Sequence, residues 1–153
     1  GYYEEGGLII KQAREMGIIQ PILGPDGFAN STLVELAGAD NVDNVFYASH
    51  FTPNSEDPKV QEFLAAFEAE YGKPADSFAA LAYDAAQLVF DAIANADSTD
   101  PQAITDALAA TEDFEGVTGT FSFDENHNPI KSAFVIELQD GVEVGNSVVE
   151  PAK

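Results

Sequence analysis

Residues 1–27 read GYYEEGGLIIKQAREMGIIQPILGPDG, and this stretch decides the predicted fold more than any other. Residues 4–16 begin with acidic side chains, carry basic ones toward their end and are followed by Gly17, an order typical of an α-helix. The short apolar run at residues 18–24 is bounded by turn residues and predicts a buried strand. The sequence GPDG at residues 24–27 then predicts a loop.

The same alternation continues after this loop. Asn30 or Ser31 is placed to cap a short helix that runs through Leu36, and residues 42–49 (VDNVFYAS) predict a second strand. Helices that alternate with strands are typical of a parallel sheet flanked by helices, so the predicted fold class is α/β.

The middle of the chain is dominated by helical patterns. Helices are predicted at residues 60–72, from Ser77 to about Ala94, and after Asp100-Pro101, where a capping residue precedes a proline. In the second of these helices apolar residues recur at helical spacing, with Phe78 near its start. The polar positions between them predict a solvent-facing side made of Asp84, Gln87, Asp91 and Asn95.

The last part of the chain has a β pattern. Residues 117–123 and 132–138 predict two strands that are joined by DENHNP and followed by a turn at Asp140-Gly141. Such a hairpin does not complete the parallel sheet predicted for the first part, and the sequence begins at Gly1 rather than at a methionine. Both features predict that the chain is part of a longer protein.

The composition is strongly acidic and excludes several classes of partner. In 153 residues there are 27 Asp and Glu against 6 Lys and Arg, a formal net charge of −21, which repels nucleic acid and anionic membrane surfaces. The chain has no cysteine, so it has neither disulfides nor a thiol nucleophile. No apolar run approaches the ~20 residues that a membrane-spanning helix needs.

The sequence contains a partial calcium-loop pattern. Asp124, Asn126 and Asn128 occupy alternate positions, as in a calcium loop, but no glycine provides the sharp turn and Val135 stands where the bidentate acid belongs. We therefore expect a turn rich in Asx residues and no metal site.

No arrangement of catalytic residues is found either. The two histidines, His50 and His127, lie far apart in the sequence, and no Ser–His–Asp set, zinc spacing or glycine-rich phosphate loop is present. The sequence predicts neither an enzyme nor a cofactor. His50 follows a predicted strand, so it either approaches a ligand or is an ordinary surface histidine.

A binding site is predicted at one edge of the sheet. Ligands of open α/β sheets bind in the loops that follow the carboxyl ends of parallel strands. Asp26 follows one such strand, and Tyr2 and Tyr3 follow another if it precedes Gly1 in a longer chain. A carboxylate and a phenol together suit an ammonium group, and Phe78 offers apolar surface. The alternatives are an Asx turn for Asp26 and core packing for Phe78.

Three stretches carry a resemblance to a known family: residues 1–27, the segment AALAYDAAQLVFDAI, and FEGVTGTFSFDENHNPIKSAFVIEL. Together they resemble the C-terminal portion of the substrate-binding proteins of branched-chain amino acid ABC transporters, which are type I periplasmic binding proteins. The resemblance implies an extracytoplasmic protein, in the periplasm or a cell-surface lipoprotein, that captures an amino acid between two α/β lobes and delivers it to a membrane permease. A ligand-sensing domain of a receptor or regulator with the same clamshell fold is the alternative.

The resemblance also implies an assignment of segments and residues. Residues 1–48 would be the end of the second lobe, residues 49–129 a hinge crossing with helices and a strand on the first lobe, and residues 130–153 the last crossing and closing strands. Tyr2 and Asp26 would hold the ammonium group of the ligand, and Phe78 would line its side-chain pocket.

The first-lobe groups that take the ligand carboxylate are absent from this chain. We therefore expect weak binding or none by this chain alone. Its uncovered sheet edge and apolar helix faces predict strand exchange or a homodimer.

Overall fold

The computed structural model describes residues 1–151, and the chain divides into two compact units. The first unit contains residues 1–52, 76–78 and 133–149. The second contains residues 53–75, 79–132 and 150–151. Each unit is described below by itself.

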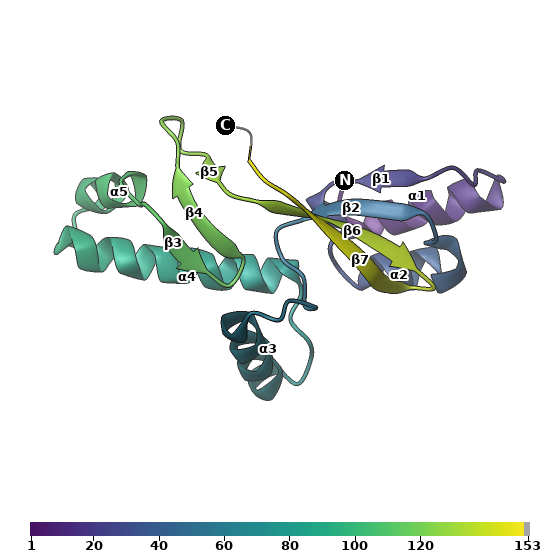
Figure 1. Ribbon diagram of the computed structural model, residues 1–153, viewed down its shortest axis with the longest axis horizontal. Helices are drawn as coiled ribbons and strands as arrows, with labels where there is room; N and C mark the ends of the chain where they lie inside the picture. Colours follow the sequence, from purple (N-terminus) through teal and green to yellow (C-terminus); the bar gives the residue numbers. More distant parts are fainter. Residues whose placement is uncertain (152–153) are drawn as a thin grey trace. The chain divides into compact units, whose positions relative to one another are not determined.

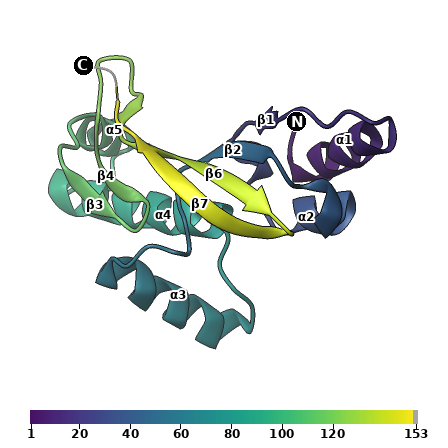
Figure 2. The ribbon, with the colours of Figure 1, turned by 45° about the vertical axis from the view of Figure 1, so that its right-hand side comes forward.

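A mixed sheet forms the centre of the first unit (Figure 1). Its strands follow the order β1 (Ile22–Gly24), β2 (Val45–Ser49), β6 (Ala133–Gln139), β7 (Val142–Val149). β1 and β2 are parallel, whereas β6 and β7 join as antiparallel strands and appear as a long paired ribbon in Figure 2. The predicted α/β class with a parallel sheet pair is confirmed, and the antiparallel half extends it.

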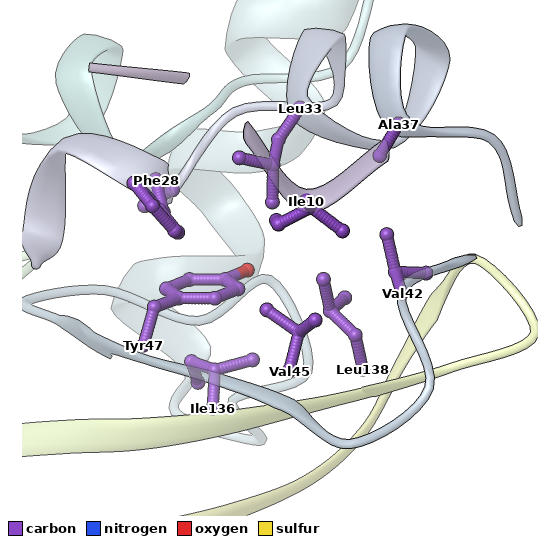
Figure 3. Close-up of a cluster of buried hydrophobic side chains, with 10 residues drawn as sticks. Ile10, Phe28, Leu33, Ala37, Val42, Val45, Tyr47, Ile136 and Leu138 are labelled. Atoms are coloured by element: carbon purple, nitrogen blue, oxygen red, sulfur yellow. The ribbon is translucent and has the colours of Figure 1, made fainter. Parts of the chain in front are cut away.

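The helices of this unit cover one face of the sheet. They are α1 (Tyr3–Glu15) and α2 (Thr32–Ala37), accompanied by the 3-10 turns η1 (Asp26–Phe28) and η2 (Ala39–Asn41). Figure 3 shows the core between helices and sheet, where side chains from both layers meet. Its labelled members are Ile10, Phe28, Leu33, Ala37, Val42, Val45, Tyr47, Ile136 and Leu138.

Arg14, the only arginine of the chain, ties three segments of the first unit together. Its Nη1 donates to the carbonyls of Ile18 and Gln20 at 2.7 and 3.0 Å. Its Nε donates to the carbonyl of Asn41 at 3.2 Å, and its Nη2 donates to that of Asp43 at 2.8 Å. The planar guanidinium thus joins the end of α1, the approach to β1 and the approach to β2.

We expect Arg14→Lys to lower the free energy of unfolding by about 1–3 kcal/mol, because an ammonium group keeps the charge but cannot reach four carbonyls in one plane. Urea denaturation followed by circular dichroism measures the change. Lys11→Arg, an exchange of the same two residue types at an exposed position of α1, is the control and should change stability by less than about 0.5 kcal/mol. Equal stability of Arg14→Lys and the native chain would contradict the role of the guanidinium.

The second unit combines helices with a small antiparallel sheet. Its helices are α3 (Pro58–Tyr71), α4 (Ser77–Ala96, of which the first two residues belong to the first unit) and α5 (Pro101–Ala109). Its strands lie in the order β3 (Phe114–Gly116), β4 (Gly119–Phe123), β5 (Pro129–Ile130). The predicted cap of α5 is confirmed, because the Asp100 carboxylate accepts a hydrogen bond from the amide of Ala103 at 3.0 Å.

The predicted hairpin between residues 117–123 and 132–138 is wrong. β4 pairs with the short β5, and β6 instead pairs with β2 of the first unit. The connection DENHNP is the expected Asx turn, since Asp124 accepts from the amides of Asn126 and Asn128. These hydrogen bonds lower the pKa of Asp124. The tight turn closes a hairpin of two short strands, and the chain then leaves to bury Ile136 and Leu138 in the other core.

Asp84 does not face solvent as predicted. Its side chain is buried, with a residue exposure of 3%. Oδ1 accepts from the amide of Val117 at 2.8 Å, and Oδ2 accepts from the amide and the hydroxyl of Thr118 at 2.8 and 2.6 Å. Gly116 is required beside it, because a Cβ there would lie 2.3 Å from Oδ2. The carboxylate therefore attaches α4 to the link between β3 and β4.

We expect Asp84→Asn to lower the free energy of unfolding by about 1–3 kcal/mol, because the amide group turns an NH₂ toward buried backbone N–H donors that the carboxylate accepts from. Denaturant titration followed by circular dichroism measures the loss. Asp91→Asn removes one charge from an exposed position of the same helix and should stay within about 0.5 kcal/mol of the native chain. Similar stabilities of the two variants would refute the structural role of Asp84.

Among the described residues, one helix, α4, is long and apolar enough to cross a membrane by length and composition. The sequence had predicted no apolar run of that length. This property is weak evidence for a membrane segment, because core helices pass the same test. The hydrogen-bonded Asp84 in its first half is typical of a helix that packs inside a protein.

Candidate functional site

The carboxyl ends of β1 and β2 lie at the same edge of the first unit's sheet, as predicted for a parallel pair. β1 ends at Gly24 and leads into η1, which begins with Asp26. β2 ends at Ser49 and is followed at once by His50. The parallel pairing of β1 and β2 therefore places a carboxylate and an imidazole in adjacent loops.

Tyr2 and Phe78 come together although 75 residues separate them in the chain. Their ring centroids are 6.2 Å apart, and the ring of Tyr3 lies 6.0 Å from that of Phe78. Tyr2 also packs closely against η1, because a Cβ on Gly27 would lie 3.1 Å from Tyr2 Cδ1. The structure thus brings Tyr2 beside Phe78 and beside the residue that follows Asp26.

Two polar contacts hold the segment that carries Phe78 in the first unit. Asn30 Nδ2 donates to Asp76 Oδ2 at 2.8 Å, while Asn30 Oδ1 accepts from the amide of Thr32. The hydroxyl of Ser77 lies 3.5 Å from that of the buried Ser49. Phe78 is therefore positioned from both sides of the loop edge, by the loop after β1 and by the end of β2.

A cavity of about 380 Å³ opens beside the aromatic rings. Tyr2 is well exposed there, with a residue exposure of 62%, whereas Phe78 is half-buried. The rings provide apolar surface and the surrounding side chains are polar or acidic. The lining residues are Tyr2, Tyr3, Glu4, Glu5, Asn30, Asp76 and Phe78.

Asp26 faces His50 across the loop edge. The distance from His50 Nε2 to Asp26 Oδ2 is 3.9 Å, with 35% and 61% of the two side chains exposed. The pair attracts when the imidazole is protonated. From the sequence, His50 was predicted to be either a ligand contact or an ordinary surface histidine. Its position directly after a strand of the parallel pair was the signal that indicated the site.

Known proteins resemble this chain over most of its length. A family profile described as periplasmic binding protein matches residues 4–143. This chain belongs to the periplasmic binding protein family. Among curated relatives, a leucine-, isoleucine-, valine-, threonine- and alanine-binding protein of Pseudomonas aeruginosa is 33% identical over 82% of this chain and 33% of its own length.

Two solved structures of periplasmic binding proteins resemble the chain over 99% of its length, each with a TM-score of 0.89. One is LivJ of Streptococcus pneumoniae, a branched-chain amino acid transporter substrate binding protein in complex with isoleucine, which is 42% identical. The other is the leucine binding protein LivK of Thermotoga maritima, 34% identical. The chain covers 43% of either structure, so it spans less than half the length of these relatives.

In the first unit of this periplasmic binding protein, a buried tyrosine of β2 is hydrogen-bonded to a glutamate of β7. The hydroxyl of Tyr47, whose residue exposure is 4%, donates to Glu143 Oε1 at 2.7 Å. Burial and the neighbouring carboxylate raise the pKa of the Tyr47 phenol. Burial also raises the pKa of Glu143, although hydrogen bonds from Tyr47 and Thr52 oppose this effect.

Because the pKa of Glu143 is raised in the folded state, the folded chain holds that proton more tightly than the unfolded chain does. The tighter binding of this proton raises the free energy of unfolding at pH values below 4.5, the ordinary pKa of a glutamate. This stabilisation is lost as the pH rises through the raised pKa of Glu143. We expect Glu143→Gln to retain the hydrogen bond from Tyr47 and to become more stable, relative to the native chain, between pH 4 and pH 7.

Urea denaturation at both pH values measures the difference between the variant and the native chain. Glu137→Gln, at an exposed position of the adjacent strand β6, is the control and should show no such trend. A stability difference for Glu143→Gln that stays constant with pH would contradict the burial of an ionisable group at this position.

Proposed function

We propose that this chain is the C-terminal portion of an extracytoplasmic solute-binding protein that captures amino acids, with branched-chain amino acids as the preferred class, for uptake by an ABC transporter. The observation that supports the proposal is that Tyr2 lies beside Phe78 and packs against Gly27, the residue that follows Asp26 at the carboxyl end of β1. The relatives named for branched-chain amino acids support the same class of ligand. No chemical step is part of the proposed activity.

In this proposal Asp26 receives the ammonium group of the ligand. Its carboxylate is accessible at the end of β1, where a cation can approach it. The phenol of Tyr2, on the neighbouring loop, supplies a second polar contact, and charge-assisted hydrogen bonds of this kind are among the stronger ones. The negative net charge of the chain favours the approach of a cationic group over that of an anion.

Phe78 and the adjoining tyrosine rings would contact the side chain of the ligand. Their surface is apolar, and the Asn30–Asp76 hydrogen bond holds the segment that carries Phe78. An aliphatic side chain that leaves water for such a surface gains about 25 cal/mol for each Å² it buries. This pairing of a carboxylate with aromatic rings fits an amino acid with an apolar side chain.

The proposal assigns residues 1–48 to the end of the second lobe, residues 49–129 to a hinge crossing and to elements of the first lobe, and residues 130–153 to the last crossing and closing strands. Closure of two lobes would then select the ligand-bound state for delivery to a permease. The groups that bind the ligand carboxylate would come from a segment outside this chain. Its location would be the periplasm or a cell surface.

We expect Asp26→Asn to weaken leucine binding by about 100-fold, because loss of one partner of a desolvated charge pair costs roughly 2–5 kcal/mol. Isothermal titration calorimetry measures the affinity on a polypeptide that joins this chain to the missing N-terminal portion. Asp40→Asn, an exposed aspartate of η2, removes the same charge and should bind leucine with the native affinity.

A matched pair of ligands tests the same contact from the other side. 4-Methylpentanoate is leucine without its ammonium group, and it should bind the native protein at least 100-fold more weakly than leucine. Equal affinity for the two ligands, or native leucine affinity in Asp26→Asn, would overturn the proposal that Asp26 binds an ammonium group.

A further inference from the structure

The imidazole of His50 lies where it can compete for the carboxylate of Asp26. The two side chains come from different loops of the same sheet edge, and 3.9 Å separates Nε2 from Oδ2. The position of His50 is restrained, because Ser49 before it is buried and donates through its hydroxyl to the carbonyl of Phe51 after it. The imidazole is therefore presented to Asp26 by fixed backbone on both sides.

We propose that His50 is a further residue of the ligand site and that its protonation sets the affinity of Asp26 for a ligand ammonium group. The inference rests on the proposed function, in which Asp26 is the ammonium receptor. A protonated imidazole and an ammonium group are two cations near one carboxylate, and each reduces the attraction available to the other. A neutral imidazole leaves the carboxylate to the ligand.

The direction of the pH effect follows from linkage. An imidazole gains its charge as the pH falls through the range from 8 to 5. Asp26 on η1 is a charged group that lies 3.9 Å from this imidazole, and Tyr2, which packs against the neighbouring Gly27, carries a phenol that is neutral in that range. The ligand ammonium disfavours the imidazolium, so ligand affinity must fall as the solution becomes acidic, by at most tenfold for each pH unit.

The chain offers a direct control for this effect. His50 and His127 are its two histidines, and His127 lies in the Asx turn of the second unit with a positive φ of 63°. Asparagine tolerates that backbone conformation. His50→Asn and His127→Asn therefore remove one imidazole each with the same replacement.

The experiment measures leucine affinity by calorimetry at pH 7.5 and pH 5.5 on the polypeptide that joins this chain to the missing N-terminal portion. We expect the dissociation constant to rise about tenfold at pH 5.5 in the native protein and in His127→Asn, and by less than twofold in His50→Asn. A native dissociation constant that does not change with pH, or a tenfold change that persists in His50→Asn, overturns the inference while leucine binding at pH 7.5 upholds the proposed function. Absence of leucine binding at pH 7.5 overturns the proposed function itself.

A second measurement needs no ligand and no added segment. Proton NMR follows the titration of both imidazoles in this chain, with and without Asp26→Asn. We expect the variant to lower the pKa of His50, since it removes the carboxylate that lies 3.9 Å from Nε2 and attracts the imidazolium, and to leave that of His127 unchanged. An unchanged pKa of His50 in Asp26→Asn overturns the inference.

Discussion

The pairing of β2 with β6 is the interaction on which the first unit depends. The register joins Val45 to Leu138 and Tyr47 to Ile136, so side chains that are 89 or more residues apart enter one core. The closure of such a long loop carries an entropic cost that the burial of this core must offset. Because β2 is also the parallel partner of β1, the same strand fixes the edge at which Asp26 and His50 meet.

Much of this organisation could be predicted from local patterns. The helix at the start, the two parallel strands and the capping aspartate of α5 follow from short-range signals that the structure preserves. The pairing of residues 133–139 could not be predicted in this way, because a strand with alternating apolar residues fits any sheet edge that offers a matching face. The resemblance assigned closing strands to residues 130–153, but local patterns did not predict β7, because Gly145 and the polar residues around it weaken the β pattern of that segment.

The burial of Asp84 could not be predicted from the sequence either. On a helical wheel an aspartate belongs with the polar side, and nothing local indicates that two backbone amides and a hydroxyl of a distant segment will surround it. At the candidate site, Tyr2, Asp26 and Phe78 were reachable from strand order and from resemblance, and the structure brings Tyr2 close to the other two segments. The approach of His50 to Asp26 depends on side-chain directions in two loops, which strand order does not specify.

Phe78 sits at a junction in the connectivity of the chain. It ends the short segment 76–78 that belongs to the first unit, yet it is also the second residue of the continuous helix α4, whose remaining residues belong to the second unit. A substitution of Phe78 therefore changes the first turn of a helix whose remaining 18 residues, 79–96, all belong to the other unit.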